Sequence, residues 1–400
     1  MSDVDQSRLG HPTQRPIVAA FFGNPMIRSD GCHARVLEML DFLSEFGSDL
    51  TFYSFENYPV WPWSEHHITE FKRTFPNVHL VLDRWSRSAN LLRRCKNALC
   101  SLMPQVSATL AELTVPWILP EWIKIRRNHR DAIYFITYAD SLTQLNGIDF
   151  SRVIVDTHDL SFRNYGLVTG KSAWRPGVIR RLRRELSLLE STAMVIAIAP
   201  NETSFFQLML KSTKVCYVPP RIPPAGKIHE NTAIEADILF VGSDNVKNVR
   251  YINSFLSKYQ RWRSFPSLAV AGNVCRHLSG EYLRAGNIKV KGYVDDLPAL
   301  YRSVRAVICP VEGTGVNIKA MEALAYGKPV FASASAIGGL PPGSEACVFP
   351  LGEESVCGLL ADPERLKQAS QAAVAYVDSP FIRQAWSNLG DDLRSMIRKD

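Results

Sequence analysis

Short apolar runs alternate with longer stretches of helical spacing along most of the chain. Runs that are rich in β-branched and aromatic residues and bounded by turn residues indicate buried strands. Twelve segments fit: residues 17–22, 50–54, 78–82, 132–137, 153–156, 193–199 and 215–218 in the first half, and 238–242, 268–272, 288–292, 306–310 and 329–332 in the second. Strands that alternate with helices favour an α/β fold with parallel sheets.

Helical spacing is clearest at two places. Segments 31–46 and 381–397 carry apolar residues three and four positions apart, with polar residues between them. This spacing predicts helices that pack one face on the rest of the protein. The apolar positions are Val36, Leu37, Leu40 and Leu43 in the first segment, and Ile382, Trp386, Leu389, Leu393 and Ile397 in the second.

One proline-rich break divides the pattern. Segment 219–226 reads PPRIPPAG, which can continue neither a helix nor a central strand. A chain of 400 residues also exceeds one ordinary core, at roughly 150 residues per domain. We therefore predict two Rossmann-like lobes whose parallel sheets face a central cleft. The expected parts are a flexible N-terminus 1–15, a first domain 16–218, a linker 219–236, a second domain 237–380, and a C-terminal helix 381–400 that packs back toward the first lobe.

Composition and charge favour a cytoplasmic globular protein. The formal net charge of +7 is mildly basic and suits ligands that carry phosphate. The eight cysteines are scattered without a CxxC pair, which indicates reduced thiols rather than disulfides or a zinc site. The N-terminus lacks the apolar core of a secretion signal. Segment 98–119 is too interrupted by prolines and a glutamate to supply the roughly 20 apolar residues of a membrane span.

The segment 306–330 carries the strongest chemical signal. It reads as a strand, a Gly313-Thr314-Gly315 loop, a helix that stops at Gly327, and a second strand. A glycine-rich loop that leads into a helix start offers N–H groups and positive dipole to an anion such as a phosphate. Three other strands of this half end at glycines, which favours a ligand crevice at that edge of the sheet, although tight turns alone would also use glycine.

Lys319 and Glu322 lie three residues apart within the expected helix and therefore share one face. A lysine adds positive charge beside a diphosphate, and a carboxylate accepts hydrogen bonds from a ribose or sugar diol. An ordinary surface ion pair gives the same spacing, so the spacing alone leaves both interpretations open.

The sequence GTGVNIKAMEALAYGKPV resembles the C-terminal signature of family 4 glycosyltransferases, a group of retaining enzymes with the GT-B fold. Other pieces follow in the order found in that family, so that the resemblance covers roughly residues 17–332. They are a proline-containing loop at 24–31, DTHD at 156–159, AIAPNE at 197–202, FVGS at 240–243 and GYVDD at 292–296.

The resemblance implies a role for particular residues. Glu322 would bind the ribose hydroxyls, and Tyr293 and Val294 would border the base. Residues 313–316 (Gly313, Thr314, Gly315 and Val316) would face the diphosphate and the donor sugar. Lys247, after Gly242, and Lys319 would meet the phosphates, together with the helix start. From the first lobe, His158 would line the catalytic cleft, and Gly31 would lie on the acceptor side.

Two positions depart from the family pattern. Thr314 stands where a second glutamate is usual, eight residues before the ribose-binding one, and Ser243 stands where an arginine is usual. Both changes touch donor contacts, which keeps a non-catalytic nucleotide- or sugar-binding partner subunit as an alternative. A same-fold epimerase would need a carboxylate set, and a phosphorylase a cofactor lysine, neither of which can be identified in the sequence.

The expected reaction is transfer of a hexosyl group from a nucleotide-sugar to a glycan or lipid-linked acceptor, as in polysaccharide biosynthesis, without a cofactor. No Asp-x-Asp motif suggestive of a metal-diphosphate site stands out, and adjacent pairs such as Asp295-Asp296 more often point apart than chelate, so no metal is expected. His158 would orient or activate the acceptor hydroxyl, or hydrogen-bond the donor sugar; its alternative is a simple turn residue.

Two basic tracts with tryptophan, 84–96 and 171–184, suggest peripheral contact with an anionic membrane. A solvated charged face explains them equally well. No nucleic-acid partner is expected, because the charge is modest and no recognised binding motif is present.

Overall fold

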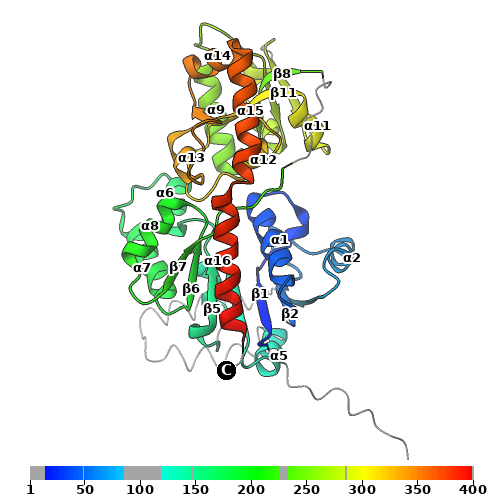
Figure 1. Ribbon diagram of the computed structural model, residues 1–400, viewed down its shortest axis with the longest axis vertical. Coiled ribbons are helices and arrows are strands. Elements are labelled where there is room, and N and C mark those ends of the chain that lie inside the picture. Colours follow the sequence, from blue (N-terminus) through cyan, green and yellow to red (C-terminus); the bar gives the residue numbers. More distant parts are fainter. Residues whose placement is uncertain are drawn as a thin grey trace, which may run out of the picture.

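The computed structural model describes residues 14–47, 49–84, 119–145, 147–224, 233–283 and 286–398. Two α/β lobes are stacked along the long axis of the molecule, and the last helix runs from the second lobe down along the first (Figure 1). Each lobe is built on one parallel sheet with helices on both faces. The prediction of two Rossmann-like lobes is confirmed.

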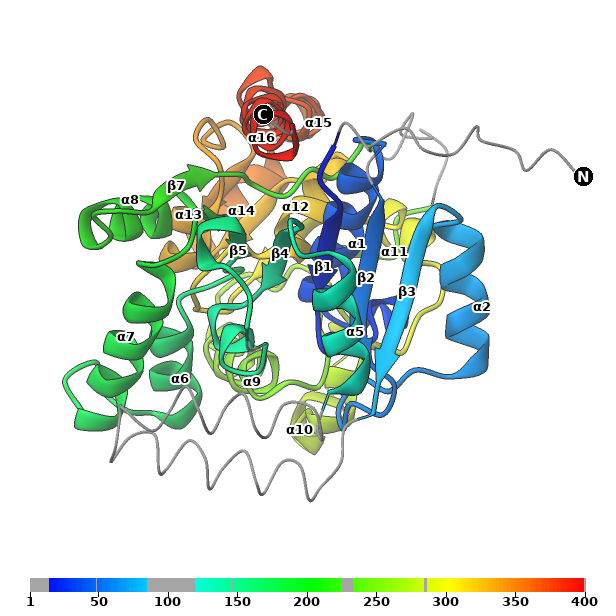
Figure 2. The same cartoon turned by 90° about the horizontal axis from the view of Figure 1, so that it is seen from below.

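The N-lobe holds seven parallel strands in the order β3-β2-β1-β4-β5-β6-β7. Its strands are β1 (Ile17–Ala20), β2 (Leu50–Phe55), β3 (Val78–Asp83), β4 (Ile133–Thr137), β5 (Val153–Asp156), β6 (Met194–Ala197) and β7 (Lys214–Tyr217). Its helices are η1 (Pro25–Ile27), α1 (Gly31–Ser44), α2 (Glu65–Thr74), α5 (Pro120–Asn128), η3 (Ala139–Thr143), η4 (Phe150–Arg152), α6 (Ser161–Thr169), α7 (Pro176–Leu189) and α8 (Pro200–Met209). Seen from below, α2 lies beyond β3 at one end of the sheet and α6, α7 and α8 lie toward the other end (Figure 2).

The C-lobe holds six parallel strands in the order β10-β9-β8-β11-β12-β13. Its strands are β8 (Ala236–Val241), β9 (Leu268–Ala271), β10 (Ile288–Gly292), β11 (Val304–Cys309), β12 (Val330–Ala332) and β13 (Val348–Pro350). Its helices are α9 (Val246–Tyr259), η5 (Asn273–His277), α10 (Gly280–Leu283), α11 (Leu297–Arg302), α12 (Ile318–Ala325), α13 (Ala334–Gly339), α14 (Glu353–Ala361) and α15 (Pro363–Val377), and α16 (Pro380–Ile397) follows.

Continuous apolar runs explain why the central strands are buried on both faces. In β1, Ile17 and Ala19 belong to one hydrophobic cluster, and Val18 and Ala20 belong to another on the opposite face of the sheet. Helices cover both faces of a parallel sheet, so its inner strands read as continuous apolar runs. In both lobes the strand order reverses beside the first strand, between β1 and β4 and between β8 and β11. Ligands of open α/β sheets bind at such a point, beyond the carboxyl ends of the strands.

Helix α16 returns to the N-lobe. The indole of Trp386 packs edge-on against Phe42 of α1, with ring centroids 4.9 Å apart, and Asp392 pairs with Lys214 of β7. A further contact joins the ends of the described chain, where Gln14 and Arg398 form an antiparallel bridge. The chain therefore crosses between the lobes twice, once after β7 and once at the start of α16.

The strands expected from the sequence all occur, but the elements between residues 334 and 350 were not predicted. Strand β13 and helix α13 were missed, because a three-residue strand and a six-residue helix are too short to show a period. Nearly all of segment 98–119 and of the basic tract 84–96 lies outside the described residues. Among the residues that are described, no helix is long and apolar enough to cross a membrane.

Candidate active site between the lobes

A cleft opens between the lobes at the carboxyl ends of both sheets. From the C-lobe it is lined by the four residues of the loop 313–316 (hereafter the 313–316 loop), by Lys247 and by Lys319. From the N-lobe it is lined by Gly31, His158 and Asp159, among others. The structure thus brings together residues that are more than 280 positions apart in the sequence.

The 313–316 loop lies directly against the N-lobe. Gly315 has φ of +77°, and a Cβ atom on it would lie 2.4 Å from the backbone oxygen of His158. Gly31 approaches from the other side, where an added Cβ would lie 2.8 Å from the Ile318 side chain. Glycine is required at both positions, because any side chain would push the lobes apart.

Part of the loop's hydrogen-bonding capacity is already used within the protein. The N–H of Gly313 donates to Ser335 Oγ at 3.3 Å, and that of Gly315 donates to Glu202 Oε1 at 2.5 Å. At the start of α12, Asn317 Oδ1 accepts the N–H groups of Lys319 and Ala320. The helix start therefore offers a ligand fewer amides than its sequence suggests, and the two lysines carry more of the positive charge available to an anion.

Lys247 lies in the first turn of α9, beside the loop. A Cβ atom on Gly313 would lie 3.6 Å from its Nζ atom, so the ammonium group stands next to the loop backbone. Across the cleft is Asp159, whose pKa is raised by burial although the charge of Lys247 opposes that rise. Near them, Ser243 Oγ donates to Asp30 Oδ1 at 3.1 Å, which adds a direct contact between the lobes.

Glu202 joins the lobes from beneath the 313–316 loop. It lies in the first turn of α8, fully buried, and accepts the N–H of Gly315. Burial raises the pKa of Glu202 to about 8, and the carboxylates of Asp159 and Glu185 contribute to that rise, while the amides of Gly315 and Leu160 oppose it. A carboxyl group that is neutral over much of the physiological pH range therefore supports the central loop of the cleft.

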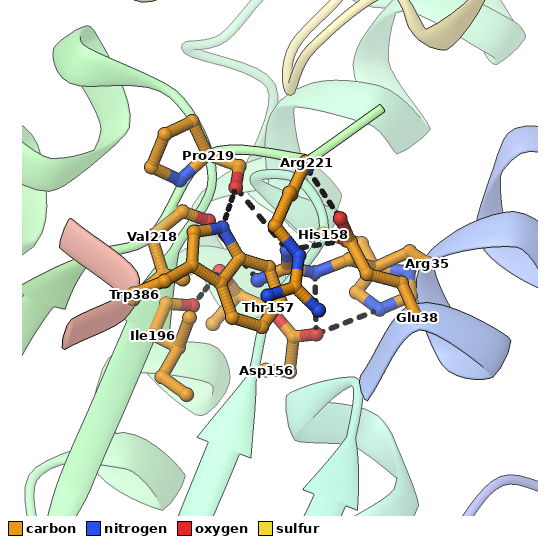
Figure 3. Close-up of polar contacts among 10 residues, drawn as sticks. All are labelled: Arg35, Glu38, Asp156, Thr157, His158, Ile196, Val218, Pro219, Arg221 and Trp386. Carbon is orange, nitrogen blue, oxygen red and sulfur yellow. Dashed lines mark hydrogen bonds and ion pairs between the residues drawn. The ribbon is translucent and has the colours of Figure 1, made fainter. Parts of the chain in front are cut away.

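His158 lies at the tip of a tight turn that follows β5. The N–H of Asp159 donates to the Thr157 carbonyl at 2.7 Å, and this three-residue turn places His158 at φ of +58°. Its Nε2 atom lies 3.2 Å from Asp156 Oδ2 (Figure 3). Its ring packs against Tyr138 with centroids 4.7 Å apart. Burial would raise the pKa of Asp156, but Arg35 and His158 together hold it below its ordinary value. The imidazole is thus fixed by a buried carboxylate and a strained backbone turn.

Glu322 lies one helical turn beyond Lys319. Its Oε2 atom pairs with Lys319 Nζ at 3.0 Å and accepts the hydroxyl of Tyr301 at 3.3 Å. Tyr301 in turn stacks on Tyr326 with ring centroids 4.9 Å apart. The carboxylate is therefore pre-positioned next to the lysine that lines the cleft.

Comparisons with known proteins agree with this architecture. Residues 235–376, which make up most of the C-lobe, match the family described as Glycosyl transferases group 1. Among solved structures, sucrose-phosphate synthase (tll1590) from Thermosynechococcus elongatus is similar at 16% identity and a TM-score of 0.66, with 96% of this chain and 99% of that one covered. Anabaena Alr3699/HepE in complex with UDP is similar at 15% identity and 0.62, over 95% and 100% of the two chains.

A third similar structure is WaaG, a glycosyltransferase involved in lipopolysaccharide biosynthesis, at 12% identity and a TM-score of 0.61, with 94% of this chain and 99% of that one covered. Two stacked Rossmann-like lobes of this topology, matched along nearly the whole chain, decide the architecture. The chain has the GT-B fold. Curated protein sequences give no match to this chain.

Within this GT-B cleft the predicted site residues fall into two groups. Lining it are Gly31, Lys247, Gly313, Thr314, Gly315, Val316, Lys319 and His158. Outside its lining are Gly242, Tyr293, Val294 and Glu322. Tyr293 follows β10, and its side chain is 69% exposed. The backbone of Gly242 packs closely against Gly272, because a Cβ atom on Gly272 would lie 2.2 Å from the Gly242 carbonyl oxygen.

Among the cleft residues that were not identified from the sequence are Asp30 and Arg35. Glu202, which supports the 313–316 loop without lining the cleft, was also not identified. Glu202 ends one of the pieces that resemble the family, but that piece gave no reason to expect a contact with the second lobe. In the described part of the chain no group of three or more His, Cys, Asp or Glu side chains is arranged to hold a metal ion. All six cysteines in the described ranges have free thiols.

Proposed function

We propose that the chain is a glycosyltransferase that moves a hexosyl group from a nucleotide-sugar to a hydroxyl of a glycan or lipid-linked acceptor, with retention of configuration and without a metal. The observation that carries the proposal is the placement of Lys247, Lys319 and the 313–316 loop opposite His158 in one cleft. Support comes also from the match of residues 235–376 to group 1 glycosyl transferases.

The donor would lie along the C-lobe. As the bond between sugar and diphosphate breaks, negative charge grows on the diphosphate oxygens, and fixed cations lower the barrier. Lys247 and Lys319 supply that charge from two helices, α9 and α12. Glu322, held by Lys319 and Tyr301, would accept the ribose hydroxyls at the nucleoside end.

The acceptor hydroxyl would approach from the N-lobe. Because Nε2 of His158 lies against Asp156, Nδ1 is the ring nitrogen left to exchange a hydrogen bond or proton with a ligand. An imidazole held in this way can take up the hydroxyl proton or hydrogen-bond the sugar. Gly31 lines the same side of the cleft, where it allows α1 to approach Ile318 closely.

Binding of nucleotides tests the donor half of the proposal. Two similar structures are complexes with UDP and with UDP-2-fluoro glucose, so UDP is the first ligand to try, followed by GDP, ADP, dTDP and CMP. We expect one nucleotide to raise the melting temperature, and Glu322→Gln to remove most of the shift. No shift with any nucleotide at millimolar concentration would contradict the donor site.

Turnover tests the enzymatic half. Incubation with the matching nucleotide-sugars and a panel of glycan and lipid-linked acceptors should release the nucleoside diphosphate, and NMR of the product should show a retained anomeric configuration. Thr314 and Ser243 differ from the family pattern, and Thr314 Oγ1 is buried without a hydrogen-bond partner among the described residues. Nucleotide binding without hydrolysis or transfer would instead favour a non-catalytic partner subunit.

The α6–α7 hairpin suggests where a membrane-bound acceptor would be met. Trp174, between the two helices, is 85% exposed, and α7 carries four exposed arginines, at positions 180, 181, 183 and 184. We propose peripheral contact of this hairpin with an anionic membrane. Cosedimentation with vesicles that contain phosphatidylserine should decrease in Trp174→Ala and in Arg180→Glu. Equal sedimentation of the wild type with neutral and anionic vesicles would contradict it.

A further inference from the structure

Arg35 is a buried cation that the proposed chemistry does not use directly. It lies on α1, its side chain is 1% exposed, and each nitrogen of its guanidinium group has a partner. Nε donates to Asp156 Oδ2 at 3.0 Å, Nη2 to the Val218 carbonyl at 3.0 Å, and Nη1 to Glu38 Oε2 at 2.9 Å (Figure 3). A buried charge is tolerated only when it is paired and hydrogen-bonded, as here.

The first group of contacts leads to the cleft. Asp156 Oδ2 is shared between Arg35 Nε and His158 Nε2, while Asp156 Oδ1 has no hydrogen-bond partner among the described residues. The carboxylate is therefore oriented through one oxygen, and Arg35 is the stronger of its two charge partners, since its guanidinium is always protonated. Removing Arg35 would leave Asp156 free to rotate away from the imidazole.

The second group of contacts leads to the first interlobe connection. Val218 and Pro219 begin the segment that leaves the N-lobe, and their carbonyls accept from Nη2 and, at 3.5 Å, from Nη1 of Arg35. Glu38, one turn along α1, completes the link, because its Oε1 accepts the N–H of Arg221 in the same segment. The exit from the N-lobe is thus fastened to α1 by Arg35 and Glu38 together.

The third group leads to the second connection, helix α16. The indole N–H of Trp386 donates to the Pro219 carbonyl at 2.9 Å. The guanidinium carbons of Arg35 and Arg221 lie 5.1 and 4.8 Å from the centre of the Trp386 ring, within the range of cation–π attraction. Both crossings between the lobes therefore meet at the residue that also orients Asp156.

We propose that Arg35 is a positioning residue. It couples the position of both interlobe connections against α1 to the orientation of the His158 imidazole. The coupling passes through Asp156 on one side and through the Val218–Pro219 carbonyls and Trp386 on the other. This inference rests on the proposed glycosyl transfer. It explains how His158 in the N-lobe keeps its position relative to the lobe that would bind the donor. A lysine cannot replace the guanidinium, because one ammonium group cannot span these separate acceptors.

The first measurement needs no turnover. The chain contains nine histidines, so protein labelled with ¹⁵N-histidine gives few imidazole signals, and His158→Ala identifies the one of interest. We expect Arg35→Lys and Trp386→Phe each to shift or broaden the His158 signal while that of exposed His66 stays in place. Arg305→Lys is the matched control, since Arg305 also pairs with a carboxylate and a carbonyl, Asp237 and Leu360, in the body of the C-lobe.

An unchanged His158 signal in folded Arg35→Lys would overturn the proposal, and a change in Arg35→Lys without one in Trp386→Phe would overturn the coupling to the connections. Trp386→Phe keeps the test decisive if Arg35→Lys does not fold.

A second test measures turnover. Arg35→Lys should lower kcat about 10- to 100-fold with little change in the KM for the donor, and it should cause no further loss of kcat when combined with His158→Ala. Independent losses would indicate a merely structural role. Absence of any wild-type turnover would refute the proposed function and leave the imidazole result standing.

Discussion

The replacement Glu202→Gln tests how the two lobes are held together beneath the 313–316 loop. Glutamine keeps an oxygen that can accept the Gly315 N–H, but it cannot ionise. The side chain is fully buried, and its other oxygen, Oε2, has no hydrogen-bond partner among the described residues. The change therefore removes a titration and leaves the shape and the main contact in place.

The expected difference in stability between the wild type and Glu202→Gln follows from the pKa of Glu202. Burial raises the pKa of Glu202 from 4.5 to about 8, so between these values the folded protein binds more protons than the unfolded chain. Stability then falls as pH rises, by about 1.4 kcal/mol per pH unit, until the folded group is itself ionised. From pH 5.5 to pH 8 the wild type should lose about 3 kcal/mol relative to the glutamine variant, or roughly 10 °C in melting temperature for a lobe of this size.

Scanning calorimetry of both proteins between pH 5.5 and 8.5 measures this difference. Groups that titrate in both proteins cancel when the two melting temperatures are subtracted at each pH. We expect the melting temperature of Glu202→Gln to rise steadily above that of the wild type up to about pH 8 and then to stay level. Glu190→Gln is the control, because Glu190 also accepts backbone amides, from Lys211 and Ser212, but at a partly exposed position. Melting temperatures of wild type and Glu202→Gln that run parallel over the whole range would refute the reasoning.

Three further predictions concern the cleft. Gly315→Ala should destabilise the protein by about 1–3 kcal/mol more than Gly47→Ala, since both glycines have positive φ but only Gly315 would clash with His158, and thermal melts of the two variants compare them directly. Lys247→Ala should raise the Kd for the nucleoside diphosphate about tenfold in calorimetric titration, and an unchanged Kd would remove Lys247 from the phosphate site. Turnover should be unaffected by excess EDTA, whereas activity restored only by Mg²⁺ or Mn²⁺ would contradict the metal-independent mechanism.

The fold was readable from the sequence because it depends on local repetition. Each inner strand of a parallel sheet is buried on both faces, so runs such as 153–156 stand out from the amphipathic helices around them. β13 escaped notice because its three residues are too few to form a pattern. The 313–316 loop could be located in advance because its glycines, the strand before it and the helix after it are contiguous in the chain.

The supporting residues could not be found in this way, because their partners are remote. Glu202 and Gly315 are 113 positions apart, and Arg35 and Val218 are 183 apart. Arg35 looks like an ordinary polar position of an amphipathic helix until the fold buries it against Asp156 and α16. Free amides at the start of α12 were overestimated for a related reason, since the sequence does not show that Asn317 turns back to cap the helix.

The contact of Trp386 with Pro219 also limits how this molecule can open. Because the two crossings touch each other, both covalent connections between the lobes lie at one corner of the molecule, and a rigid-body rotation of one lobe against the other would turn about that corner. Helices α6 and α9 lie on the side opposite α16 (Figure 2), where Arg250 Nη1 donates to the Leu167 carbonyl at 3.0 Å. Rotation of the lobes about that corner therefore requires this hydrogen bond to break, together with those that join Gly315 to Glu202 and Ser243 to Asp30.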